Sequence, residues 1–77
     1  MAAMRDDFPR SVPGPQLAEL RKQVGIRQDS LALRLGMHRV TLSGIERAPE
    51  VDPVRAARYR AALRELVAEA VEPESVA

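Results

Sequence analysis

The chain has 77 residues, 12 basic and 11 acidic side chains, a net charge of +1 and no cysteine. Its length supports one domain with a modest core, and the lack of cysteine excludes disulfides and cysteine-ligated zinc. No apolar run approaches the ~20 residues of a membrane span, and the N-terminus lacks the apolar segment of a signal peptide. We therefore expect a cytoplasmic protein without membrane contacts.

The near-neutral total hides an uneven distribution of charge. Residues 21–64 hold ten basic and four acidic side chains, a balance of +6, whereas residues 65–77 carry −4. Basic side chains gathered in one region are typical of a protein that binds a polyanion such as nucleic acid. The solvated surface of an arginine-rich helical protein would look similar, so the charge pattern alone favours nucleic acid only slightly.

In chain order, the first segment with a helical pattern follows a flexible arm expected over residues 1–14. Pro15 suits a first helical turn, and apolar residues then recur at helical spacing as far as Val24. Gly25 fits the left-handed position that ends a helix. We therefore predict that the folded domain begins at about residue 15.

Three more helices follow, and they complete an all-α, compact four-helix domain over residues 15–71. The second spans about residues 28–35 and ends at Gly36, and the third spans about residues 39–47, with Met37 filling the gap between them. Asp52-Pro53 is a strong start signal for the last and longest helix, over about residues 53–71. Residues 72–77 are expected to form a flexible tail.

The stretch from Gly25 to Arg47 carries the main functional signal. It contains Gln-x-x-Leu-Ala-x-x-Leu-Gly from Gln28, followed ten residues later by Ile45-Glu46, and the pattern resembles the Xre/Cro/lambda-repressor-like helix-turn-helix family. The resemblance implies that the helix over residues 39–47 enters the major groove of DNA while the helix before it braces on the backbone. Arg27 and His38 depart from the usual capping residues, and one long last helix replaces two short ones.

Residues at the exposed start of the third helix are the candidates for reading bases. The guanidinium of Arg39 matches the acceptors of guanine, although it would also suit a phosphate. Val40 would pack on a thymine methyl or fill the boundary between helices, and His38 would contact a base or phosphate or cap the helix. The predicted base contacts are His38, Arg39, Val40 and Ser43.

Other polar residues are predicted to hold the DNA backbone. The resemblance implies that Gln28 donates to a phosphate at a helix N-terminus, where free N–H groups already favour an anion, although it would also serve simply as a helix-start residue. Arg47 would contact a phosphate or act as a cation at a helix C-terminus. The predicted phosphate contacts are Arg27, Gln28, Thr41 and Arg47.

The resemblance also implies a structural ion pair between Arg21 and Glu46, which would tie the first helix to the third. A metal site is not expected, because His38 is the only histidine and lacks partners. No serine has a plausible general base, and no glycine-rich phosphate loop is present, so we expect neither enzymatic activity nor a cofactor.

The last helix is apolar on more than one side. Ala56, Tyr59, Leu63, Leu66, Val67 and Ala70 form a broad apolar face, and small residues lie on roughly the opposite side. That second face would suit a dimer interface formed by Ala57, Ala61 and Ala68, although alanine is also simply a good helix former.

Together these features predict a sequence-specific regulator of transcription that binds double-stranded DNA. We expect a repressor, of the kind found in phages and other small autoregulated systems, that binds a palindromic operator as a homodimer and needs no small-molecule ligand. The alternative is an antitoxin or adaptor that binds a protein partner through its long last helix.

Overall fold

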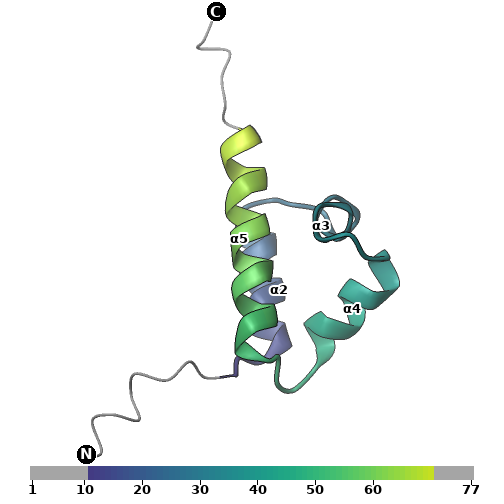
Figure 1. The fold of residues 1–77 in the computed structure, drawn as a ribbon. Helices are drawn as coiled ribbons and strands as arrows, with labels where there is room; N and C mark the ends of the chain where they lie inside the picture. Colours follow the sequence, from purple (N-terminus) through teal and green to yellow (C-terminus); the bar gives the residue numbers. More distant parts are fainter. Residues whose placement is uncertain (1–10, 71–77) are drawn as a thin grey trace, which may run out of the picture.

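The computed structural model of the chain describes residues 11–70, which form four helices. These are α2 (Gly14–Gln23), α3 (Gln28–Leu35), α4 (Arg39–Arg47) and α5 (Pro53–Ala70). The expected all-α fold with a long C-terminal helix is confirmed (Figure 1). None of the described helices is both long and apolar enough to cross a membrane.

Local signals explain where these helices begin and end. Gly25 and Gly36 follow α2 and α3 with φ angles of 72° and 71°, in the left-handed region that glycine adopts without a steric penalty. The side chain of Asp52 accepts a hydrogen bond from the backbone N–H of Arg55 at 3.2 Å, which caps the start of α5. Pro53 then occupies the first position of this helix, where its missing N–H costs nothing.

The four helices pack in a ring in which the backbones of α4 and α5 lie apart and only side chains join them. α4 packs against α2 and α3, and α5 packs against the same two helices from the other side. Figure 1 shows α5 beside α2, with α3 and α4 together on one side of this pair. The core between them consists of Leu17, Leu31, Ala32, Leu42, Ile45, Val51, Ala56, Tyr59, Ala62 and Leu63.

The ordered domain begins earlier than the sequence indicated. Val12 and Val51 exchange two backbone hydrogen bonds, of 3.1 and 2.7 Å, in an isolated antiparallel bridge. Gly14 is already buried in the first turn of α2, so the arm predicted over residues 1–14 is wrong for residues 12–14. The domain begins earlier because the backbone groups of Val12 pair with the loop before α5. Residues 1–10 of the arm, residue 71 of the predicted last helix and the tail over residues 72–77 lie outside the described residues.

The buried face of α5 also differs from the apolar face that helical spacing predicted. Ala56, Tyr59 and Leu63 are buried as expected, but Ala70 is exposed, and Ala62 takes a place in the core. The difference arises because α3 and α2 both pack on α5, so its buried strip is turned toward Ala62. Beyond Val67 the side chains of the helix are exposed, and Glu69 pairs with Arg34 of α3.

Candidate nucleic-acid interface

The outer face of α4 is polar and accessible along its whole length. His38, Arg39, Val40 and Thr41 are all exposed, and Val40 keeps 75% of its surface accessible. On the inner face, Leu42 and Ile45 are buried in the core, so packing fixes the rotation of the helix about its axis. Gly44 is exposed, and a Cβ atom at this position would meet nothing within 4 Å. A flat surface can therefore approach this part of α4 closely.

The N-terminal ends of α3 and α4 leave their first N–H groups without side-chain partners. Arg27 and His38 occupy the N-cap positions, and neither side chain makes a capping hydrogen bond. The capping role considered for His38 is therefore not seen. Uncapped helix N-termini carry free donors and the positive end of the helix dipole, which are suited to anionic groups such as phosphates.

Two neighbouring depressions gather many of the predicted DNA contacts. One lies between Arg27, Gln28, Asp29 and Arg39, so the guanidinium of Arg39 shares a surface with the start of α3. The other includes Lys22, Gln28, Ser43 and Arg47. Gln28 borders both. His38, Val40 and Thr41 line neither depression and project separately from the start of α4.

Asp29 and Glu19 place negative charges on this mostly basic surface, one in each depression. Asp29 is paired with a neighbouring arginine. Its carboxylate lies 3.1 Å from Nη2 of Arg27, and both side chains are more than half exposed. An exposed pair of this kind contributes little to stability. It can open at small cost, which would release the Arg27 guanidinium for another anion.

Behind this surface, one carboxylate joins all four helices. Nε and Nη2 of Arg21 in α2 donate to the Glu46 oxygens at 2.7 and 3.1 Å. From α3, Nε2 of Gln28 donates to Oε1 at 2.9 Å, and from α5 the Tyr59 hydroxyl donates to Oε2 at 2.5 Å. A carboxylate has about four acceptor sites, so Glu46 is fully satisfied although it is buried.

The hydrogen bonds keep Glu46 ionised inside the domain. Burial raises the pKa of a carboxyl group, but the bonds from Arg21, Tyr59 and Gln28 together outweigh burial and hold the pKa of Glu46 below its ordinary value. Burial and the neighbouring Glu46 carboxylate raise the pKa of Tyr59, so its hydroxyl keeps the proton that it donates. The second acceptor near that hydroxyl is the Leu17 carbonyl oxygen at 3.1 Å.

Gln28 supports Glu46 and also borders the surface predicted to contact DNA, and the sequence revealed only the second of these roles. One N–H of its amide is directed to Glu46 at 2.9 Å, and the side chain is only half buried. A primary amide has two N–H donors, so the second remains for a phosphate. The bond to Glu46 fixes the orientation of that second donor.

Two residues at the site were not singled out from the sequence. Lys22 lies beside Ser43 and Arg47 because α2 crosses α4. It was visible only as one of ten basic residues in the middle of the chain. Tyr59 was assigned to the apolar face of the last helix, and nothing in the sequence links its hydroxyl to a glutamate 13 residues away.

The exposed polar helix, supported by a second helix across a tight turn, defines a DNA-binding helix-turn-helix domain. A family model described as helix-turn-helix matches residues 17–65. The chain belongs to the Xre/Cro/lambda-repressor-like helix-turn-helix family. Comparison with curated proteins and with solved structures gives no match.

Membership of this family makes the protein a regulator of transcription that binds double-stranded DNA. The family consists of DNA-binding regulators and is generally non-enzymatic. Among residues 11–70, no cluster of histidine and carboxylate side chains has the composition of a metal site.

Proposed function

We propose that the protein is a sequence-specific repressor that binds a palindromic operator as a homodimer. The observation that carries the proposal is the exposed N-terminal half of α4, whose inner face is fixed by Leu42 and Ile45. Because packing fixes the rotation of α4, the same side chains face the DNA at every site. Binding to DNA would take place at the nucleoid, within the cytoplasm.

Direct reading of bases is assigned to four residues of α4 and its N-cap. The long guanidinium of Arg39 can reach guanine O6 and N7, and Val40 offers an apolar surface to a thymine methyl. His38 and Ser43 add shorter polar groups at either end of this surface. Since only Arg39 provides a bidentate donor, we expect one base position to dominate the specificity.

Phosphate contacts are assigned to Arg27, Gln28, Thr41 and Arg47. Gln28 and Arg47 border the same depression as Lys22, which we add to this set. Contacts of this kind position the protein without specifying sequence, and each cation that neutralises a phosphate steepens the salt dependence of binding.

A selection of operator sequences from random DNA, followed by titration of variants, tests both roles. Arg39→Ala should weaken operator binding by about 1–3 kcal/mol and relax one base position. Arg47→Ala should weaken binding to all sequences alike and lower the salt slope by about one charge. Arg64→Ala, on α5, is the matched control and should change neither. Equal weakening of operator and random DNA by Arg39→Ala would contradict its assignment to a base.

The homodimer is proposed from the small-residue side of α5. Ala57 and Ala68 are exposed, and Ala61 is half buried. A two-fold dimer would place two copies of α4 about 34–36 Å apart, in successive major grooves. Ala61→Glu should then give monomers and reduce full-operator binding far more than half-site binding, whereas Ala70→Glu should not. A monomer of 8.5 kDa with and without operator, measured by sedimentation, would rule the dimer out.

A further inference from the structure

An apolar groove runs between α2 and α5. Its walls are Leu20 from α2, Val24 directly after α2, and Leu63, Val67 and Ala68 from α5, and its volume is about 510 Å³. Leu20 and Val24 remain 38% and 46% exposed, although they share helical spacing with the fully buried Leu17. A continuous groove of partly exposed apolar side chains offers a surface that another molecule can cover.

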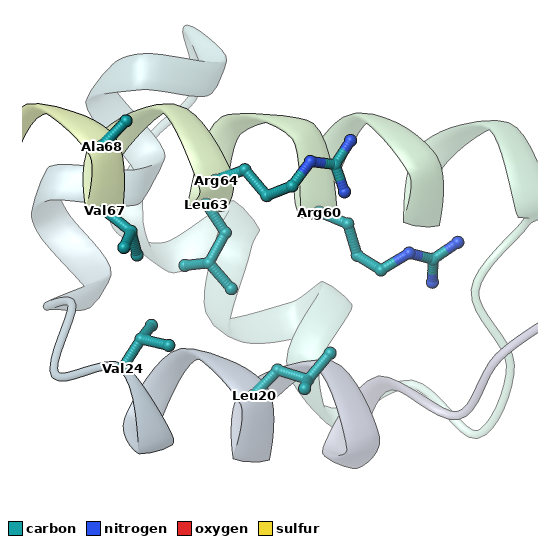
Figure 2. Close-up of a pocket in the computed structure, with 7 residues that line it drawn as sticks. All are labelled: Leu20, Val24, Arg60, Leu63, Arg64, Val67 and Ala68. Carbon is teal, nitrogen blue, oxygen red and sulfur yellow. The ribbon is translucent and has the colours of Figure 1, made fainter.

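Two arginines give the groove a direction. Figure 2 shows the guanidinium groups of Arg60 and Arg64 at one end of the groove and Val24 with Val67 at the other. No acidic side chain among residues 11–70 forms an ion pair with either arginine. An occupant that carries apolar side chains and negative charges in the same order would therefore be complementary to the groove.

The dimensions of the groove favour a helix. Its wall on α5 extends from Arg60 to Ala68, which is a little over two helical turns or about 12 Å. Because it is open along this length, it would leave a small molecule largely in water, whereas tight small-molecule sites bury most of their ligand. A helix can lay side chains spaced i, i+3 or i+4, and i+7 into such a groove.

A second copy of the chain fits the groove less well. A two-fold axis along the groove would bring a second Arg60 and a second Arg64 against the first pair, so like charges would meet at a desolvated surface. An axis across the groove would set each arginine pair against the apolar end of the other copy, where no carboxylate lines the groove. In addition, α3 and α4 lie behind the α2–α5 pair in Figure 2, on the side away from the groove. Two copies joined here would present their recognition helices in opposite directions, which does not suit one operator.

We propose that the α2–α5 groove binds an acidic amphipathic helix of a partner protein. The apolar side chains of that helix would cover Leu20, Val24 and Val67, and its carboxylates would pair with Arg60 and Arg64. Because the groove faces away from α4, the partner would bind while the protein is on DNA. The protein would thus connect a DNA site to a second protein, in addition to occupying that site.

The test uses the full chain and fluorescent synthetic peptides of about 14 residues, roughly four helical turns. One peptide is an amphipathic helix with leucines at i, i+4 and i+7 and glutamates along one flank. The second is a scrambled peptide of the same composition, and the third carries lysine in place of each glutamate. Fluorescence anisotropy measures binding. We expect only the first peptide to bind, with an affinity that falls as salt rises.

Variants then locate the binding surface. Leu20→Gln and Arg64→Glu should each lower the affinity for the first peptide by about tenfold or more, that is about 1.4 kcal/mol. The matched control is Leu33→Gln, because Leu33 is 82% exposed on α3 and lies outside the groove. It should bind the peptide like the unsubstituted chain. The thermal midpoint of every variant is measured to establish that the fold is retained.

Several results would overturn the proposal. These are failure of the first peptide to bind, equal binding of the scrambled peptide, and equal loss of affinity in Leu20→Gln and Leu33→Gln. A dimer in sedimentation that Leu20→Gln dissociates would assign the groove to a second copy instead. Operator binding by Leu20→Gln is measured in parallel and should be unchanged, so failure here is distinct from failure of the DNA-binding proposal.

Discussion

Removal of one hydroxyl group, in Tyr59→Phe, should measurably destabilise the whole domain. The hydroxyl lies 2.5 Å from Glu46 Oε2 and 3.1 Å from the Leu17 carbonyl oxygen. It has one proton, and the carboxylate is the stronger acceptor, so the bond to Glu46 is the one that counts. Phenylalanine fills the space of the ring, and no cavity results. The effect therefore isolates a single hydrogen bond to a buried charge.

A hydrogen bond to a charged group contributes about 1.5–3 kcal/mol. For a domain of this size, a loss of ~2 kcal/mol lowers the melting temperature by roughly 8–16 °C. Urea and thermal unfolding, followed by circular dichroism at neutral pH, measure the change. The control is Arg34→Ala, which removes two ion pairs to Glu65 and Glu69 whose carboxylate side chains are more than half exposed. Such exposed pairs contribute little to stability, so Arg34→Ala should lower the melting temperature much less than Tyr59→Phe.

A double-mutant cycle with Glu46→Gln separates the bond from other effects of the substitution. If the hydroxyl acts through the carboxylate, the two changes should be non-additive by about 0.5–3 kcal/mol. A loss under about 0.5 kcal/mol in Tyr59→Phe, or strict additivity with Glu46→Gln, would refute the assignment of this bond as a stabilising contact.

Three further outcomes are expected. Because the pKa of Glu46 is held below its ordinary value, its contribution to stability is complete above about pH 4.5 and is lost as the pH falls through the lowered pKa; acid titration of unfolding should show this loss in the unsubstituted chain but not in Glu46→Gln. Gly14→Ala should lower the free energy of unfolding in urea by about 1–3 kcal/mol or more, since its Cβ would clash with the Ile45 carbonyl oxygen; normal stability would contradict the close approach of α2 to α4. Gly44→Ala should stabilise α4 by up to about 1 kcal/mol, because nothing lies within 4 Å of the new Cβ, yet weaken operator binding in a gel-shift assay; unimpaired binding would show that α4 does not approach the groove floor at this position.

Helix positions were the part of the fold most accessible from the sequence. Gly25 and Gly36 act through their own backbone conformation, and Asp52-Pro53 acts through a cap within the first turn of the helix. These effects are local, so they can be recognised without knowledge of the fold. The bridge between Val12 and Val51 was not predictable, because it depends on how the loop before α5 passes the start of α2.

In the candidate site, too, local features were predictable from the sequence and contacts between distant residues were not. The exposure of Arg39 and Val40 follows from the amphipathic pattern of a single helix. By contrast, the bonds of Glu46 to Gln28 and Tyr59 join positions 18 and 13 residues apart and require the crossing of helices to be known. The exposure of Leu20 was hidden for a related reason, since helical spacing shows that apolar residues share a face but does not show whether that face is covered.

The meeting of one side chain from every helix at the Glu46 carboxylate bears on how the domain opens. If any helix detaches, a buried charge loses a partner, and the penalty falls on the other three as well. Partial opening is therefore costly, and amide hydrogens in all four helices should exchange with solvent through a common unfolding event rather than helix by helix. A recognition helix held in this way stays folded in the absence of DNA, so little ordering entropy opposes binding.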